Sequence, residues 1–265
     1  MNSAENASTV KVGLYDLLEL EFEAALDSPV DNSARSAIVF NGIFTDGITT
    51  LTIPGFWFGG NVWKLRFSPV SEGVWNWSTN SDDPSLDGKT GSLTCIGSSK
   101  KGFLQVDRTN PHVFCYSNGT KEYLWGNTAY SLLRARLECR TEDWQSFFKE
   151  SKSYGMNKLR VLVIMWFWGN YDIENVEKDH YPWDPYTREN PQFTAFKPEY
   201  WEGFDDIVEY ASINDMFIEL ILFPDYSYSQ GDTDHYPGDK GLYEMTGEDE
   251  RRSCWIFSEK WIITI

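Results

Sequence analysis

Residues 61–69, "NVWKLRFSP", alternate between apolar and charged side chains. The apolar side chains fall on one side of an extended chain and the charged ones on the other: Trp63, Leu65 and Phe67 against Lys64 and Arg66. Because successive side chains of a β-strand point to opposite faces, this pattern predicts a strand with one buried and one solvated face. Residues 17–26 ("LLELEFEAAL") and 73–79 ("GVWNWST") follow the same rule.

Turn signals separate these runs, among them "DSPVDNS", "FGGN" and "DDPSLDG". Short alternating strands joined by Gly-, Pro- and Asp-rich turns predict an antiparallel β-sandwich of roughly 90 residues, immunoglobulin-like in size. The chain has 12 Trp and 17 Phe. Aromatic faces can stack on sugar rings, but in these strands we interpret the Trp side chains as core.

From about residue 100 the period changes. Residues 141–155 form an amphipathic helix pattern, with Thr141 as its N-cap and Gly155 as its stop. An apolar run from Leu159, a second helix that begins near Pro198 and a third apolar run, "MFIELILF", follow. This β-α-β-α-β order predicts a parallel sheet with right-handed crossovers. The intervening segment 169–197 is too long for a plain connector and is interpreted as a functional loop.

Composition excludes several classes of function. The net charge of −17 and the pI of about 4.5 argue against nucleic-acid binding and against an anionic membrane surface. The four cysteines form no C-x-x-C pair, and the three histidines have no metal-ligand spacing, so no metal and no cofactor are expected. No apolar run approaches the roughly 20 residues of a membrane span, and the polar N-terminus predicts no signal peptide and a cytoplasmic location.

Polar and aromatic side chains at expected strand ends are candidates for ligand binding. Tyr123, Leu124 and Trp125 suit a buried strand, so Asn127 would follow its end, as Asp225 follows the third apolar run. Trp166 and Trp168 would share one face at the end of the second run and could offer a stacking platform. In a barrel, functional groups occupy this rim. The alternatives are a turn Asn, a turn Asp and packing under the long loop.

The stretch "IPGFWFGGNVWKLRFSPVSEGVWNWST" resembles the N-terminal immunoglobulin-like module of a group of bacterial glycoside hydrolases. The second half is similar to the apiosidase-like (β/α)8 barrel that follows that module, in "NPHVFCYSNGTKEYLWGNTAY", "YGMNKLRVLVI" and "PEYWEGFDDIVEYA". The resemblance implies an all-β immunoglobulin-like sandwich over residues 1–99 and the N-terminal portion of an incomplete α/β TIM-type barrel over residues 100–265.

The same resemblance implies a glycosidase that acts on polysaccharide side chains or oligosaccharides with two carboxylates, one an acid and the other a nucleophile or base. It places Arg160, a charge inside an apolar run, beside a catalytic carboxylate; the alternative is a structural salt bridge. Relatives often carry Asp or Thr where this chain has Asn127, and "HPYD" where it has "PDYS" at 224–227.

The catalytic pair is expected beyond residue 265, so we expect this chain to be inactive alone. A second hypothesis is a non-catalytic carbohydrate-binding or adaptor protein, and a third is a truncated gene product without a function of its own.

Overall fold

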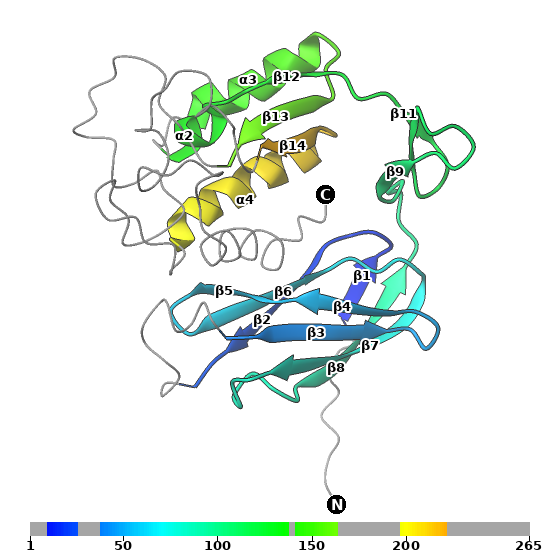
Figure 1. The fold of residues 1–265 in the computed structure, drawn as a ribbon, viewed down its shortest axis with the longest axis vertical. Helices are drawn as coiled ribbons and strands as arrows, with labels where there is room; N and C mark the ends of the chain where they lie inside the picture. Colours follow the sequence, from blue (N-terminus) through cyan, green and yellow to red (C-terminus); the bar gives the residue numbers. More distant parts are fainter. Residues whose placement is uncertain (1–9, 26–37, 138–140, 164–196, 222–265) are drawn as a thin grey trace, which may run out of the picture. The chain divides into compact units, whose positions relative to one another are not determined.

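The computed structural model describes residues 10–25, 38–137, 141–163 and 197–221 (Figure 1). Residue contacts divide the chain into two units, with the boundary between Glu122 and Tyr123. Within the described residues, no sheet contains strands of both units.

Eight strands of the first unit form two sheets. The larger has the order β1-β8-β7-β3-β4, built from β1 (Val10–Gly13), β3 (Phe40–Thr45), β4 (Thr50–Pro54), β7 (Gly73–Ser81) and β8 (Thr90–Ile96). Its pairs are antiparallel except β1 with β8, which is parallel. The smaller sheet is antiparallel and has the order β2-β6-β5, from β2 (Leu18–Glu23), β5 (Phe56–Gly59) and β6 (Val62–Phe67).

The core of this unit lies between the two sheets. Three apolar side chains of β6 are at most 1% exposed, as their alternation predicts: Trp63, Leu65 and Phe67. Phe67 stacks on Phe44 of the larger sheet, with 4.0 Å between the ring centroids, and also packs against the fully buried Trp75. The prediction that the Trp residues of the strands build a core is therefore confirmed for Trp63 on β6 and for Trp75 on β7.

A small antiparallel sheet follows, with the order β11-β10-β9. It comprises β9 (Leu104–Val106), β10 (Phe114–Tyr116) and β11 (Lys121–Glu122). Among the described strands it pairs with neither of the larger sheets. The contact boundary lies at its end, whereas the boundary predicted from the change of period lies at residue 99 and stays a prediction.

The second unit contains a three-stranded parallel sheet with the order β12-β13-β14. Its strands are β12 (Gly126–Thr128), β13 (Lys158–Leu162) and β14 (Phe217–Ile221), and its helices are α2 (Leu132–Leu137), α3 (Thr141–Ser153) and α4 (Pro198–Ile213). The predicted β-α-β-α-β order and parallel pairing are confirmed for these strands. Helices α2 and α4 contact β13 and β14 respectively (Figure 1).

Local sequence signals explain the helix ends. Pro198 occupies the first turn of α4, where its missing N–H costs nothing. Gly155, just after α3, has a φ of +80°, the left-handed conformation predicted from its position. No helix in the described ranges is long and apolar enough to cross a membrane.

The prediction of a strand over Tyr123–Trp125 is wrong, because the strand begins only at Gly126. Tyr123 and Trp125 are 80% and 47% exposed. The backbone of this segment is bonded instead by Asn157. The side chain of Asn157 accepts from the Trp125 N–H at 2.9 Å and donates to the Tyr123 carbonyl at 2.9 Å. A side-chain amide thus takes the place of strand pairing.

Candidate functional site

A polar cluster lies on one side of the parallel sheet, made of Thr128, Lys158, Arg160 and Glu219. Thr128, Arg160 and Glu219 are direct partners in the register of β12, β13 and β14. Since register partners in a parallel sheet project to the same side, these three side chains form a row across it. Lys158 precedes Arg160 by two residues and so projects to the same side.

The opposite side of β13 is core. Leu159 and Val161 are both 0% exposed, and Ile218, the partner of Leu159 on β14, is 4% exposed. Parallel strands usually carry apolar residues on both faces. The charged side chains of Lys158 and Arg160 on β13 and of Glu219 on β14 therefore mark the polar side as something other than core, which is the property expected of a site.

The cluster is held together by ion pairs on Glu219. Lys158 Nζ donates to Glu219 Oε2, and Arg160 Nε lies 3.3 Å from Glu219 Oε1. The side chains of Arg160 and Glu219 are 47% and 43% exposed. Two cations thus surround one carboxylate and leave the cluster with a net positive charge, on a chain whose total is −17.

Arg160 and Asn127 are the two predicted site residues within the described ranges. Arg160 has the charge partner that its position in an apolar run requires. Asn127 is exposed and pairs in register with Leu159, not with Arg160, so alternation projects it to the other side. Its side-chain oxygen accepts from the Thr128 N–H at 2.8 Å. The structure therefore does not bring Asn127 into the row with Arg160.

Trp166, Trp168 and Asp225 lie outside the described residues. Their predicted clustering on one rim with Asn127 stays a prediction. Three members of the cluster, Thr128, Lys158 and Glu219, were missed from sequence. Glu219 carried a usable signal, because it interrupts the apolar run "MFIELILF" in the same way that Arg160 interrupts its own.

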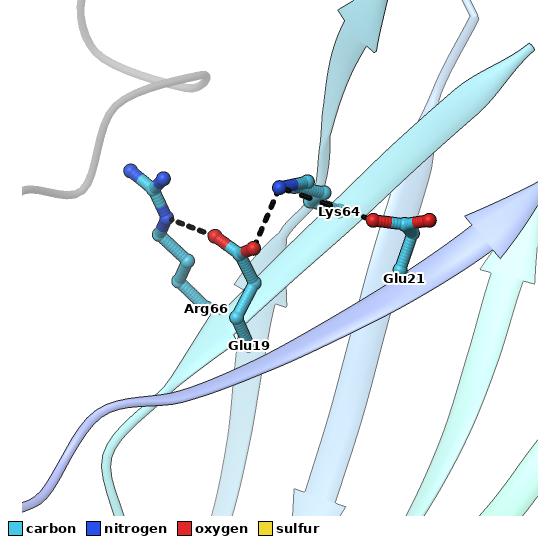
Figure 2. Close-up of polar contacts among 4 residues, drawn as sticks. All are labelled: Glu19, Glu21, Lys64 and Arg66. Atoms are coloured by element: carbon cyan, nitrogen blue, oxygen red, sulfur yellow. Dashed lines mark hydrogen bonds and ion pairs between the residues drawn. The ribbon is translucent and has the colours of Figure 1, made fainter. Parts of the chain in front are cut away.

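A second charged group lies on the outer face of β2 and β6 in the first unit. Glu19 Oε1 accepts from Lys64 Nζ at 2.6 Å, and Glu19 Oε2 accepts from Arg66 Nε at 2.9 Å (Figure 2). Lys64 Nζ also lies 3.6 Å from the centroid of the Phe58 ring and 3.9 Å from Glu21. Lys64 is only 9% exposed, so its ammonium is engaged by these contacts and is not accessible to a ligand. We therefore interpret the group as structural.

These contacts shift the titration of Glu19. Partial burial raises the pKa of its carboxyl, but the hydrogen bonds and charges of Lys64 and Arg66 together outweigh burial, and the pKa lies below its ordinary value of 4.5. The ionised form is therefore favoured in the folded chain.

Other reactive side chains of the described ranges offer little chemistry. No group of three His, Cys, Asp or Glu side chains among these residues could hold a metal ion. Cys95 and Cys115 are buried free thiols. Burial, with the nearby charges of Glu72 and Asp16, raises the pKa of Cys95. The neutral thiol, which is not nucleophilic, is therefore favoured over the reactive thiolate.

Comparisons with known proteins bear on both units. Residues 11–82 match a family described as "Domain of unknown function (DUF5060)". The chain is similar to the crystal structure of a candidate glycoside hydrolase from Bacteroides vulgatus, with a TM-score of 0.70 and 25% identity. The match covers 96% of this chain and 48% of the other, so the chain spans about half the length of that protein. No curated protein matches the sequence.

Other solved structures are less similar, with TM-scores below 0.5. A family 39 glycoside hydrolase from the gut symbiont Bacteroides cellulosilyticus shares 10% identity, covers 94% of this chain and 39% of its own, and has a TM-score of 0.22. The filamin domain of Lin-41 shares 14% identity, over 35% of this chain and 89% of its own, with a TM-score of 0.27.

Proposed function

We propose that this chain forms part of a glycoside hydrolase that acts on polysaccharide side chains or oligosaccharides. In this proposal residues 1–99 are an immunoglobulin-like sandwich and residues 100–265 are the N-terminal portion of an apiosidase-like (β/α)8 barrel. The observation that carries it is the similarity over 96% of the chain, at a TM-score of 0.70, to a candidate glycoside hydrolase.

The polar cluster gives this proposal a chemical basis. In a barrel of parallel strands, side chains from the C-terminal ends of several strands together can hold a substrate. Arg160 donates hydrogen bonds and Glu219 accepts them, which is the combination that sugar hydroxyls require. Asn127, Arg160, Trp166, Trp168 and Asp225 remain our proposed substrate-binding residues, to which we add Glu219.

We also propose that the chain does not hydrolyse glycosides by itself. Glycoside hydrolysis needs two carboxyl groups, about 5–5.5 Å apart for retention or about 6.5–9.5 Å apart for inversion. Within the described ranges, the polar cluster contains one carboxylate, Glu219, which is paired with Lys158 and Arg160. A single carboxylate cannot serve both as the acid and as the nucleophile or base.

The test is to assay the purified chain for turnover and for binding, using aryl glycosides and pectic side-chain oligosaccharides. We expect binding without turnover, and weaker binding after Arg160→Gln. Turnover that Asp225→Ala abolishes would contradict the proposed inactivity. Binding that Arg160→Gln leaves unchanged would favour the alternative, a non-catalytic carbohydrate-binding or adaptor protein that uses its sandwich.

A further inference from the structure

The polar cluster has a charge preference that the proposed function does not specify. We infer that Arg160 binds a carboxylate group, and that the ligand of the cluster is an acidic saccharide, one that contains a uronate. This inference rests on the proposed function, because it assumes that the ligand is a saccharide.

The geometry of the Arg160 guanidinium favours a carboxylate ligand. Glu219 approaches its Nε edge, with Nε as the nearest nitrogen at 3.3 Å. Within the part of the chain that the structure describes, the side chain of Arg160 makes no hydrogen bond or ion pair other than this one, while its backbone carbonyl accepts from the Ala129 N–H. The two terminal nitrogens thus keep their outer edge available. That edge presents two parallel N–H groups, which match the two oxygens of a carboxylate.

The net charge of the cluster also favours an anionic ligand. Lys158 and Arg160 carry two positive charges against the single negative charge of Glu219. A neutral sugar has no group that would use the excess positive charge, whereas a uronate would neutralise it. The rest of the chain is acidic, but at an ionic strength near 0.15 M charges beyond about 8 Å are largely screened. The local excess therefore decides the preference at physiological salt.

Substitutions of Arg160 and Glu219 are expected to change uronate binding in opposite directions. Removing the Arg160 charge should weaken uronate binding, since the two N–H donors of the guanidinium are lost. Glu219 competes with the ligand for both cations and repels its carboxylate. Glu219→Gln should therefore strengthen uronate binding. For a neutral sugar whose hydroxyls donate to Glu219, the same substitution should weaken binding instead.

The experiment measures binding by ligand-observed NMR at about 0.1 M salt, an ionic strength at which charges roughly 10 Å away are screened. Glucuronate is compared with glucose, and galacturonate with galactose, so that each pair differs only at C6. Proteins are the wild-type chain, Arg160→Gln, Arg160→Lys, Glu219→Gln and the control Arg108→Gln, which removes an exposed positive charge from the first unit. Circular dichroism establishes that each variant is folded.

We expect each uronate to bind about fivefold or more tightly than its neutral parent, since a bidentate charge-assisted pair is the stronger contact. Arg160→Gln should abolish the difference, Arg160→Lys should retain part of it, and Arg108→Gln should leave it unchanged. Equal binding of acidic and neutral sugars would overturn the inference while leaving the proposed function intact. If acetate binds as tightly as the uronates, the cluster is a simple anion site, and the inference of a saccharide ligand is overturned. Absence of any saccharide binding would overturn the proposed function as well.

Discussion

Gly126 determines how closely the first strand of the parallel sheet approaches the second. A Cβ at this position would collide with the backbone carbonyl of Lys158, which cannot move without breaking β13. We expect Gly126→Ala to destabilise the second unit by more than about 1 kcal/mol, the loss typical when a side chain is placed where the backbone cannot take it. Urea denaturation followed by circular dichroism measures the change.

Gly97→Ala is the matched control. A Cβ there would have the flexible carboxylate of Glu72 as its nearest neighbour, at 3.3 Å, and its three nearest atoms would all belong to that side chain. The control should change stability by no more than a few tenths of a kcal/mol, as is usual for surface substitutions. A loss as large as that of Gly126→Ala would show that close approach is not the cause.

At this scale the sequence predicts that a charge needs a partner, but not which one. Arg160 stood out because an unpaired charge in an apolar run is costly, and a partner is present. The partner, Glu219, comes from a strand 59 residues later in the chain, and the pairing depends on the register of β13 and β14. Register is a tertiary property, so Thr128 could not be added to the site from sequence spacing alone, whereas Lys158, two residues before Arg160 on the same strand, could have been.

At the scale of elements, the ion pairs between β2 and β6 fix the register of two strands. A slip of one residue would move the glutamates of β2 into the core. Because the pKa of Glu19 is lower in the folded chain, its ionisation adds stability above about pH 4.5, and this contribution is lost as the pH falls through the folded value.

We therefore expect Glu19→Gln to lower the stability of the first unit at pH 7, by a modest amount because the carboxylate is 34% exposed. The difference from wild type should shrink as the pH falls below 4.5, the ordinary value for this carboxyl. Urea denaturation at pH 7, 5 and 3 measures it. A difference that stays constant over this range would mean that packing, and not ionisation, is responsible.

Strands with a strict alternation of apolar and polar residues were predictable from the sequence, whereas the start of β12 at Gly126 was not. The alternation in β6 correctly names Trp63, Leu65 and Phe67 as buried, because a period of two assigns each side chain to a face. It does not predict that Lys64 on the other face is also buried, through its contacts with Glu19 and Phe58. Residues Tyr123–Trp125 are equally apolar, yet Asn157 bonds their backbone and the strand starts at Gly126. Nothing local in the apolar run reports that an asparagine more than thirty residues away will supply these bonds.

At the scale of the whole molecule, the first unit has a core that is complete before residue 99. Every residue of its buried cluster lies between Val12 and Cys95. Contacts nevertheless continue past that point, since Tyr15 packs edge-on against Phe103 with 5.5 Å between the ring centroids. Lys100 Nζ also lies 3.4 Å from Asp16. The predicted boundary at residue 99 would therefore separate the partners of both contacts, whereas the contact boundary at residue 122 keeps them within one unit.

These observations predict the behaviour of two fragments. Residues 1–99 should fold cooperatively, because they contain both sheets and the entire buried cluster. Residues 1–122 should be more stable by about 0.5–1.5 kcal/mol, the contribution of an aromatic pair such as Tyr15 and Phe103. Urea unfolding of both fragments measures this, with Phe103→Ala in the longer one as the control that should remove most of the gain. A fragment 1–99 that does not fold, beside a folded fragment 1–122, would place the domain boundary at the end of β11, because the small sheet would then be part of what the sandwich needs to form.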